Sequence, residues 1–231
     1  MSHGHGGLVS LLLADLAKHC GADIRVILTL NVPEALPLND EPCPFPMDFI
    51  RNRSPRGFGS NHNAAFRNCR TPYFCVLNPD IQLRENPFPA LIDELHRQAV
   101  GVAAPQVTDP AGNIEDSARR FPTAGIIMRK LLGLSDKQDY EATRHAFSPD
   151  WIAGMFMLFR SNVYSEVGGF DERYFLYYED VDLCRRLRGR GYDVRVLPSV
   201  SVTHDARRSS HRNLRHLRWH VASMIRFLAS G

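Results

Sequence analysis

The stretch FDERYFLYYEDVDLC, residues 170–184, places five carboxylates among aromatic side chains and ends by beginning a helix. Glu179 and Asp182 are expected to point away from the core, whereas Asp180 stands at the head of an apolar helical face. That face is completed at i+3, i+4 and i+7 by Leu183, Cys184 and Leu187. An inward-facing carboxylate at this position is either a helix cap or an acid/base group.

Length and composition are typical of a single globular domain. The chain has 231 residues, of which 44% are hydrophobic, and a net charge of only +3, which gives no indication of nucleic-acid binding. Its five cysteines lack C-x-x-C spacing, and their odd number without a recognisable signal peptide favours reduced thiols. No apolar run reaches the roughly 18 residues that a membrane span needs. We therefore expect a cytoplasmic protein.

Strands and helices alternate along the first hundred residues. The apolar pattern predicts strands over Ile24–Leu30, Met47–Ile50, Tyr73–Leu77 and Val100–Val107. It predicts helices over Leu8–His19, Asn61–Cys69 and Pro89–Gln98. This alternation favours an α/β fold with a Rossmann-like, mostly parallel sheet and flanking helices, in which ligands bind beyond the carboxyl ends of the strands.

The second half of the chain is less regular. It is predicted to contain strands over Trp151–Phe159, Asp193–Leu197 and Ser201–His204, and helices over Asn162–Val167 and His211–Leu228. No strand precedes the first helix, although a parallel sheet normally opens with one. We therefore expect that the first strand is missing or truncated. Either the natural reading frame extends upstream, or the chain is less stable than its relatives because a sheet edge is open.

Asn78-Pro79-Asp80 directly follows a predicted strand. Pro79 ends the ladder, so that Asp80 lies where an α/β sheet binds its ligands. One carboxylate, together with phosphate oxygens and water, commonly holds Mg²⁺ or Mn²⁺, but all three residues also form ordinary β-turns. His204, at another strand end, would complete such a site only if the fold brings it near Asp80, and is otherwise a surface or core histidine.

Two segments that contain glycine are further candidates. Gly57-Phe58-Gly59-Ser60 precedes a predicted helix, where backbone N–H groups can accept phosphate, although no Walker Gly-Lys-Ser/Thr follows. Trp151, close to Gly154, could form a platform for a sugar ring, and the alternative is ordinary core packing.

Together these motifs resemble the family-2 glycosyltransferases of GT-A fold, in their rhamnosyltransferase-like branch. The resemblance covers residues 50–210, and the block from Gly168 to Cys184 is its most specific part. The ordered set is Asn52-x4-Gly57-Phe58-x4-Asn63, Leu77-Asn78-Pro79-Asp80, Trp151-x2-Gly154, Gly168-Gly169-Phe170-Asp171-Glu172, Glu179-Asp180-x2-Leu183-x2-Arg186 and His204.

The resemblance implies a nucleotide-sugar donor, a divalent cation (Mg²⁺ or Mn²⁺) and inversion at the anomeric carbon. It implies that Asp180 is the catalytic base, and that Asp80 is the metal and diphosphate residue of a DxD-like motif with His204 as a further metal contact. The other implied contacts are Asn52, Gly57, Asn63 and Asn78 to the donor, and Trp151, Gly154 and Glu179 to the acceptor.

Two segments depart from the family's pattern. Residues 1–6 look like the family's first turn without the strand that usually precedes it. Leu30-Asn31-Val32-Pro33-Glu34 stands where an Asp-Asn-x-Ser segment is common. Both changes affect the expected nucleobase contacts and leave the donor's identity open.

The resulting hypothesis is a single GT-A domain. Residues 1–107 would bind the nucleotide sugar, residues 108–210 would bind the acceptor and catalyse the reaction, and residues 211–231 would form a basic amphipathic helix. The protein would be a metal-dependent, inverting glycosyltransferase in cell-surface polysaccharide synthesis, with dTDP-rhamnose as the suggested donor and a glycan or lipid-linked acceptor. The alternative is a remnant that binds nucleotide or glycan without turnover. A metal-dependent nucleotidyltransferase is a weaker alternative, since no Gly-rich loop with Lys or Arg follows a first strand.

The final predicted helix combines an apolar stripe with positive charge. The stripe consists of Leu214, Leu217, Val221, Met224, Ile225 and Leu228, and the basic residues are Arg212, Arg215, His216, Arg218 and Arg226. Either the stripe docks on the domain and leaves a solvated basic face, or the helix makes peripheral contact with the inner face of an anionic membrane.

Overall fold

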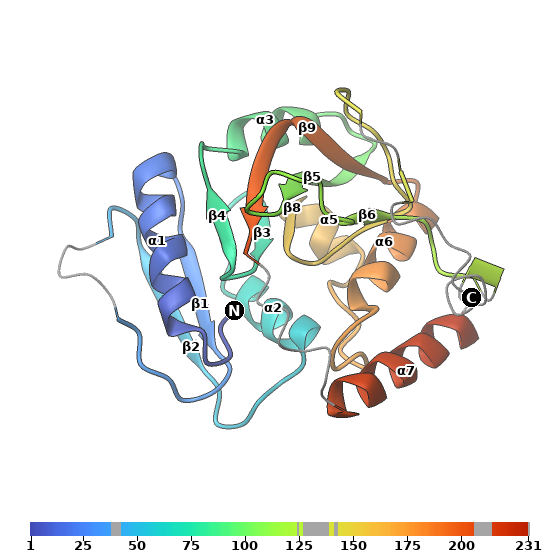
Figure 1. The fold of residues 1–231 in the computed structure, drawn as a ribbon, viewed down its shortest axis with the longest axis horizontal. Helices are drawn as coiled ribbons and strands as arrows, with labels where there is room; N and C mark the ends of the chain where they lie inside the picture. The colour runs from blue at the N-terminus through green and yellow to red at the C-terminus, as the bar shows by residue number, and fades with distance from the viewer. Residues whose placement is uncertain (38–42, 124, 127–138, 141–142, 206–213, 231) are drawn as a thin grey trace.

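The computed structural model describes residues 1–37, 43–123, 125–126, 139–140, 143–205 and 214–230 (Figure 1). Its strands are β1 (Val26–Leu30), β2 (Met47–Arg51), β3 (Tyr73–Leu77), β4 (Ile81–Leu83), β5 (Val100–Thr108), β6 (Ala118–Arg119), β7 (Trp151–Ile152), β8 (Phe156–Arg160) and β9 (Asp193–His204). Its helices are α1 (Gly6–Cys20), α2 (Phe58–Phe66), α3 (Phe88–Leu95), α5 (Ser161–Glu166), α6 (Glu179–Gly189) and α7 (Leu214–Ala229). A sheet of β3, β8, β5, β9 and β4, in that order, forms the centre, and β1 and β2 form a separate pair beside it.

The α/β fold class is confirmed, but the central sheet is mixed rather than mostly parallel. β5 pairs with β9 in parallel, as β1 does with β2, whereas β8 runs antiparallel to both β3 and β5, and β4 runs antiparallel to β9. Parallel neighbours need a crossover connection, usually a helix. β8 instead follows β7 after a turn over residues 153–155. The strand–helix alternation of the first hundred residues, from which a mostly parallel sheet was predicted, therefore does not extend to β8.

Two further predictions about strands need correction. The single predicted strand Trp151–Phe159 is divided by the 153–155 turn into β7 and β8. Conversely, the two predicted strands in residues 193–204 are one strand, β9. Its pairing with β5 shifts register between Pro105 and Gln106, which keeps the ladder continuous past Pro198.

Helices cover both faces of the central sheet and bury two apolar clusters. β8 is buried on both sides, because Phe156 and Leu158 belong to the cluster under α1 and α3, whereas Met157 and Phe159 belong to the cluster under α2, α5 and α6. This period-2 alternation explains why nearly every residue of β8 is apolar. Strands of both predicted halves, 1–107 and 108–210, share this sheet.

An apolar slot separates the two sheets. Within the described residues, β1 has no ladder with β3, and the start of the chain contributes only a parallel bridge from Ser2 to Leu30. Between these two strand edges lies a cavity of about 600 Å³, whose lining includes Cys20, Cys75 and the inner face of α1. The slot lies beside β1, where an open sheet edge was expected.

None of the helices that the structure describes combines the length and the apolar composition needed to cross a bilayer. The five cysteines are all free thiols in this structure. The described part of the final helix begins at Leu214, so the predicted residues before it lie outside the described range.

Candidate active site

Asp180 lies in the first turn of α6 and is half-buried. Its Oδ2 accepts a hydrogen bond of 3.0 Å from the N–H of Gly154, and its Oδ1 accepts one of 2.9 Å from the N–H of Val181. The three apolar residues predicted on its helical face are fully buried: Leu183, Cys184 and Leu187. Asp180 is not the N-cap residue, because Tyr178 occupies that position without a side-chain cap.

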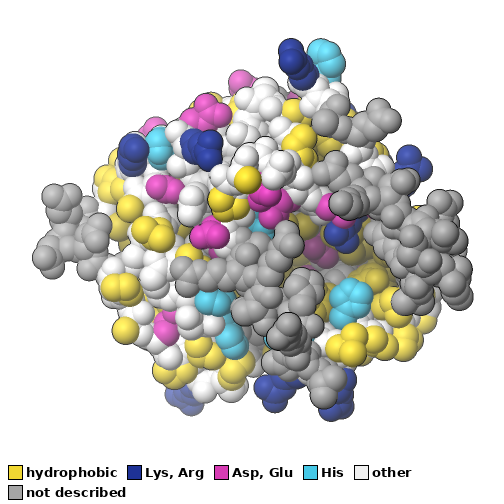
Figure 2. Space-filling view, viewed as in Figure 1, with side chains coloured by type: hydrophobic (Ala, Val, Ile, Leu, Met, Phe, Trp, Pro, Cys, Tyr) yellow, Lys and Arg dark blue, Asp and Glu magenta, His cyan; other side chains and the backbone are white. Residues whose placement is uncertain are grey.

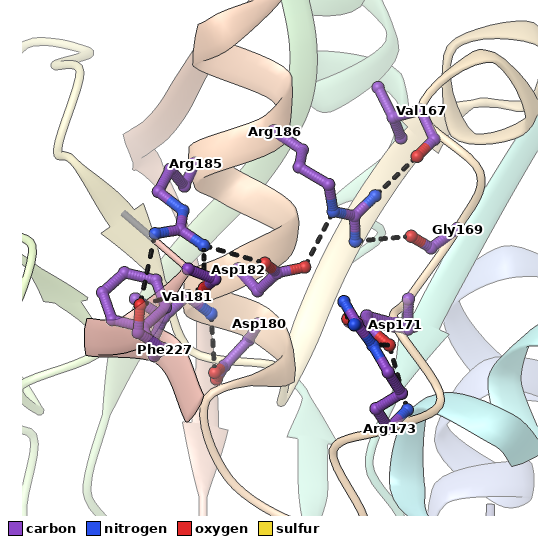
Figure 3. Close-up of polar contacts among 12 residues, drawn as sticks. Val167, Gly169, Asp171, Arg173, Asp180, Val181, Asp182, Arg185, Arg186 and Phe227 are labelled. Atoms are coloured by element: carbon purple, nitrogen blue, oxygen red, sulfur yellow. Dashed lines mark hydrogen bonds and ion pairs between the residues drawn. The ribbon is translucent and has the colours of Figure 1, made fainter. Parts of the chain in front are cut away.

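The neighbouring carboxylates do not point away from the core, contrary to expectation. Glu179 is only 4% exposed and Asp182 only 5%. Asp182 forms ion pairs with Arg186 at 2.7 Å and with Arg185 at 3.3 Å (Figure 3). The reason is that the first turn of α6 is enclosed on more than one side. On one side Arg186 also donates to main-chain carbonyls of the turn at residues 167–169, and on another Arg185 lies over the ring of Phe227 on α7.

The backbone that leads into α6 is strained and closely held. Tyr177 and Tyr178 have φ values of 71° and 66°, in the left-handed region that costs a non-glycine residue about 1–3 kcal/mol. The segment is held by α2, since Phe58 N–H donates to the carbonyl of Phe175 at 2.9 Å. Gly57 allows this approach, because a Cβ there would lie 2.6 Å from the same oxygen. Gly57, implied as a donor contact, is thus a packing residue in this structure.

Burial changes the acid–base properties of the pair at the start of α6. Burial raises the pKa of Asp180, although hydrogen bonds from Gly154 and Val181 oppose the change. Burial and then repulsion by Asp180 raise the pKa of Glu179 well above its ordinary value of 4.5. Within the described residues, Oε2 of Glu179 has no hydrogen-bond partner. Glu179 is therefore the group that retains a proton, and Asp180 is the one whose carboxylate is stabilised by donors.

A second cluster lies at the carboxyl end of β3. β4 begins immediately after Asp80 and pairs Ile81 with His204, so the end of β9 is brought beside Asp80. Nε2 of His204 lies 3.3 Å from Oδ2 of Asp80, and Nδ1 lies 2.7 Å from Oε2 of Glu115. Burial disfavours the imidazolium, but the two carboxylates outweigh it and raise the pKa of His204 to about 9. The expected proximity of Asp80 and His204 is therefore present.

Glu115 is a site residue that the sequence did not reveal. It follows a turn that returns the chain to the end of β5, where its N–H donates to the carbonyl of Val107 at 2.9 Å. Because β5 runs parallel to β9, the two strands end side by side, and Glu115 thereby reaches His204. The turn-forming sequence Asp109-Pro110-Ala111-Gly112-Asn113 is the signal that could have indicated the return.

The turn over residues 153–155 links both clusters through its backbone. Ala153 N–H donates to Ser117 O at 2.8 Å, in the loop that carries Glu115. Gly154 N–H donates to Asp180, and Met155 O accepts a hydrogen bond of 2.9 Å from Asn78 N–H. Three consecutive residues thus connect the Glu115 loop, the start of α6 and the Asn78–Asp80 turn.

Three asparagine side chains organise the carboxyl ends of β1 and β2. Asn52 Nδ2 donates to Oδ1 of Asn31 at 2.8 Å and to Oδ1 of Asn61 at 2.7 Å. Asn31 and Asn61 also bond the backbone at Arg56, just before α2. The network shapes the carboxyl ends of β1 and β2, where the donor was expected to bind. Two of its members, Asn31 and Asn61, were not among the site residues predicted from the sequence.

Asn63 and Trp151 are both occupied by contacts within the protein. Asn63 accepts from Tyr164 Oη at 2.8 Å and from Phe170 N–H at 3.0 Å, and its amide donates to Phe170 O at 2.8 Å. Trp151 Nε1 donates to Arg120 O at 2.9 Å, and the guanidinium of Arg119 lies 5.6 Å from the Trp151 ring centre. Asn63 therefore fixes the Gly168–Glu172 turn, and Trp151 forms part of the wall beside Asp180's helix.

Within the described residues, no three His, Cys, Asp or Glu side chains form a complete metal site. The Asp80 cluster nevertheless has one feature that fits a cation. Oδ1 of Asp80 is buried and has no hydrogen-bond partner among those residues, and an imidazole lies next to the same carboxylate. A carboxylate oxygen with imidazole suits a divalent ion whose remaining ligands are phosphate and water.

Residues 43–222 match the family model described as "Glycosyltransferase like family 2". The chain belongs to this family. This family-2 glycosyltransferase is 31% identical to the rhamnosyltransferase WbbL of Escherichia coli K12, over 99% of this chain and 90% of the relative. It is 35% identical to the N-acetylglucosaminyl-diphospho-decaprenol L-rhamnosyltransferase of Mycobacterium tuberculosis, over 67% of this chain. It therefore has the expected rhamnosyltransferase-like character, although it spans about half, 54%, of the mycobacterial relative.

Solved structures confirm the GT-A type of fold for this family-2 glycosyltransferase. The mannosyltransferase PcManGT from Pyrobaculum calidifontis, in complex with GDP-Man and Mn²⁺, superposes with a TM-score of 0.62 at 16% identity, over 97% of this chain and 62% of that one. GalNAc-T7 with UDP, GalNAc and Mn²⁺ gives a TM-score of 0.59 at 12% identity, over 79% of this chain and 38% of that one. At these identities the likeness concerns the fold alone.

Proposed function

We propose that this protein is an inverting glycosyltransferase that moves a sugar from a nucleotide-sugar donor to a glycan or lipid-linked acceptor in cell-surface polysaccharide synthesis. The observation that supports this most is the 153–155 turn, which connects the carboxylate of Asp180 to the Asn78–Asp80 turn. The names of the two rhamnosyltransferase relatives support rhamnose as the transferred sugar, for which we propose dTDP-rhamnose as the donor. We place the reaction in the cytoplasm.

In this proposal Asp180 is the general base. Its carboxylate removes the proton from the acceptor hydroxyl while that oxygen bonds to the anomeric carbon and the nucleoside diphosphate leaves from the opposite face. A single displacement of this kind inverts the anomeric configuration and needs no covalent intermediate. Burial, which raises the pKa of Asp180, makes its carboxylate a stronger base than an exposed aspartate.

Asp80 and His204 would hold the divalent cation, Mg²⁺ or Mn²⁺, together with the donor's phosphates. The cation would neutralise charge on the departing diphosphate. Asn78, Asn52, Gly57 and Asn63 would line or shape the donor side. Trp151, Gly154 and Glu179 would form the acceptor side, where the N–H of Gly154 keeps Asp180 in place. The division at residue 107 into donor and acceptor halves belongs to the same proposal.

The alternative, a remnant that binds without turnover, is less well supported. The chain retains Asp80, His204 and Asp180 and adds Glu115 beside His204, whereas a site that has lost its activity has no need of this full set.

The deciding experiment measures both sugar transfer and donor hydrolysis with purified protein, a panel of nucleotide sugars and either Mg²⁺ or Mn²⁺. Transfer that is abolished by a chelator and restored by the metal supports the proposal, and Asp80→Ala should lose metal-dependent donor binding. Nucleotide-sugar binding without any transfer or hydrolysis would favour the remnant, and full activity in excess chelator would exclude the metal role.

A further inference from the structure

The final helix, α7, docks on the domain through an unexpected face. Phe227 is buried with Tyr174 and Val181, and Ser223 Oγ donates to the carbonyl of Leu176 at 2.9 Å. Nearer its start, the ring of Trp219 stacks 4.6 Å from that of Phe175. These α7 residues lie at positions 219, 223 and 227, which is one side of the helix.

Four of the six residues of the aliphatic stripe predicted from the sequence lie on a different side and face solvent. Of the seven large hydrophobic residues that are exposed in the described structure, four belong to this stripe, so the exposure is concentrated here rather than scattered. They are Leu217 (59% exposed), Val221 (40%), Ile225 (59%) and Leu228 (40%). Figure 2 shows hydrophobic side chains gathered over α7 at the lower right of the molecule.

The charge of α7 indicates which partner this stripe fits. The helix contains no aspartate or glutamate between Leu214 and Ala229, while Arg215, Arg218 and Arg226 lie beside the stripe and are exposed. A protein partner would not require one sign of charge along the whole helix. A helix with an aliphatic face and basic flanks has the composition of segments that lie in the headgroup layer of anionic bilayers.

We propose that the α7 stripe, formed by Leu217, Val221, Ile225 and Leu228, inserts into the surface of an anionic membrane. This inference rests on the proposed transfer to a lipid-linked acceptor, and it states how that acceptor is reached. α7 contacts residues 175–177, which lead directly into the turn that carries Asp180. Insertion of the α7 stripe would therefore bring the segment that leads into the proposed base Asp180 close to the bilayer surface, where the reacting end of a lipid-linked glycan is located.

The test uses the full chain and vesicles without any acceptor. Sedimentation with vesicles of phosphatidylcholine alone, and of phosphatidylcholine with about one third phosphatidylglycerol, measures the bound fraction at low and high salt. We expect binding to the anionic vesicles that weakens as salt screens the arginines. Absence of binding to anionic vesicles at low salt would overturn the proposal.

Two sets of variants locate the contact. The double variant Leu217→Ser with Ile225→Ser should bind at least about tenfold more weakly, because it removes exposed apolar surface that would be buried in the bilayer. Arg218→Glu should also weaken binding to anionic vesicles. The matched controls are on α1, where Leu11 is 57% exposed and Lys18 is exposed, and Leu11→Ser with Lys18→Glu should bind like the wild type.

Three outcomes would contradict the membrane contact. One is unchanged binding by the α7 variants, and another is an equal loss in the α1 controls. The third is a homodimer in sedimentation velocity that Leu217→Ser with Ile225→Ser converts to a monomer, since the stripe would then serve a second copy of the chain.

A soluble acceptor separates this inference from the proposed function. With a short-chain acceptor in the absence of vesicles, the α7 variants should transfer sugar at the wild-type rate, whereas with acceptor in anionic vesicles they should be slower. Binding to vesicles without transfer to either acceptor would refute the proposed function and leave the membrane contact standing.

Discussion

Gly154 donates its N–H to Oδ2 of Asp180 at 3.0 Å, so the turn between β7 and β8 orients the carboxylate at the start of α6. The approach depends on the absence of a side chain at Gly154. A Cβ there would lie 3.2 Å from ring atoms of Phe58 and 3.7 Å from the Cβ of Asp180. The sequence singled out Trp151 and Gly154 together. Of the two, it is Gly154, through its backbone N–H, that contacts the candidate base Asp180.

Asp180→Asn should abolish the base while it leaves the fold largely intact. An amide oxygen can still accept one of the two hydrogen bonds, so the melting temperature should change little, and an amide cannot take the acceptor's proton. The transfer rate should therefore fall by about 10²–10⁴-fold, while donor binding persists because Asp80 is unchanged. Steady-state transfer rates, calorimetric donor binding and thermal melts check the three statements.

The control for this variant must be an exposed carboxylate. Asp182, two residues on, is unsuitable because it is buried and paired with Arg185 and Arg186, so Asp182→Asn should lower the melting temperature. Asp93→Asn is suitable, since the side chain of Asp93 is 82% exposed. Transfer by Asp180→Asn at close to the wild-type rate would mean that Asp180 serves only to hold the turn.

Glu115 should position His204 for metal and donor. Its Oε2 lies 2.7 Å from Nδ1 of His204, which leaves Nε2 directed toward Asp80. Loss of such a carboxylate partner typically weakens metal affinity about 10–100-fold. We expect Glu115→Ala to weaken the binding of Mn²⁺ with nucleoside diphosphate in that range, measured by calorimetry without turnover.

The conservative variant Glu115→Gln distinguishes positioning from folding. Its amide oxygen can still accept from Nδ1–H, so part of the Mn²⁺ affinity should return. If Ala and Gln variants bind the metal–diphosphate complex like the wild type, Glu115 has no positioning role.

Glu179→Gln should stabilise the protein increasingly as pH rises. Burial holds the folded-state pKa of Glu179 well above 4.5, so above that pH the folded protein keeps a proton that the unfolded chain releases. This linkage makes the wild type lose stability as pH rises from 4.5 toward the folded-state pKa, whereas a neutral glutamine side chain has no such loss. Thermal melts between about pH 5 and pH 8 should show a difference from the wild type that grows in favour of the Glu179→Gln variant. A difference that stays constant over this pH range would refute the assignment.

The slot between β1 and β3 should accept an added strand. A segment of β-branched residues fused ahead of Met1 would continue the parallel bridge of Ser2 with Leu30 and fill the cavity of about 600 Å³. Pairing two open edges and burying apolar surface should raise the melting temperature by at least about 4 °C. A Gly/Ser extension of equal length is the control, and equal melting temperatures for the two fusions would contradict the prediction.

Several elements follow from local pattern alone. The strand Tyr73–Leu77 was predicted with its observed ends, and the buried face of α6 followed from the spacing of Leu183, Cys184 and Leu187. These predictions succeed because the period of apolar residues is a local property of the chain. The antiparallel course of β8 was not predictable in this way, because a continuous apolar run has the same pattern whichever neighbour it pairs with.

The final helix shows the same distinction. Its amphipathic pattern determined that α7 is a helix, yet the sequence did not determine which side docks. Trp219, Ser223 and Phe227 contact the domain, whereas four residues of the aliphatic stripe are exposed. Which side of a helix docks depends on the shape and the hydrogen-bonding groups of the surface that it meets. For α7 that surface exists only once residues 174–178 have folded.

The sequence by itself determined the family and the α/β class and singled out Asp80, Asp180 and His204 as candidate site residues, because ordered motifs and apolar periods are written along the chain. Only the tertiary structure decided that Glu115 reaches His204, that the backbone of Gly154 holds Asp180, and that Asp182 is buried in an arginine pair. Each of these contacts joins residues at least one element apart or depends on what covers a helix face. Their geometry is set by strand register and packing, and one sequence pattern is compatible with many such arrangements.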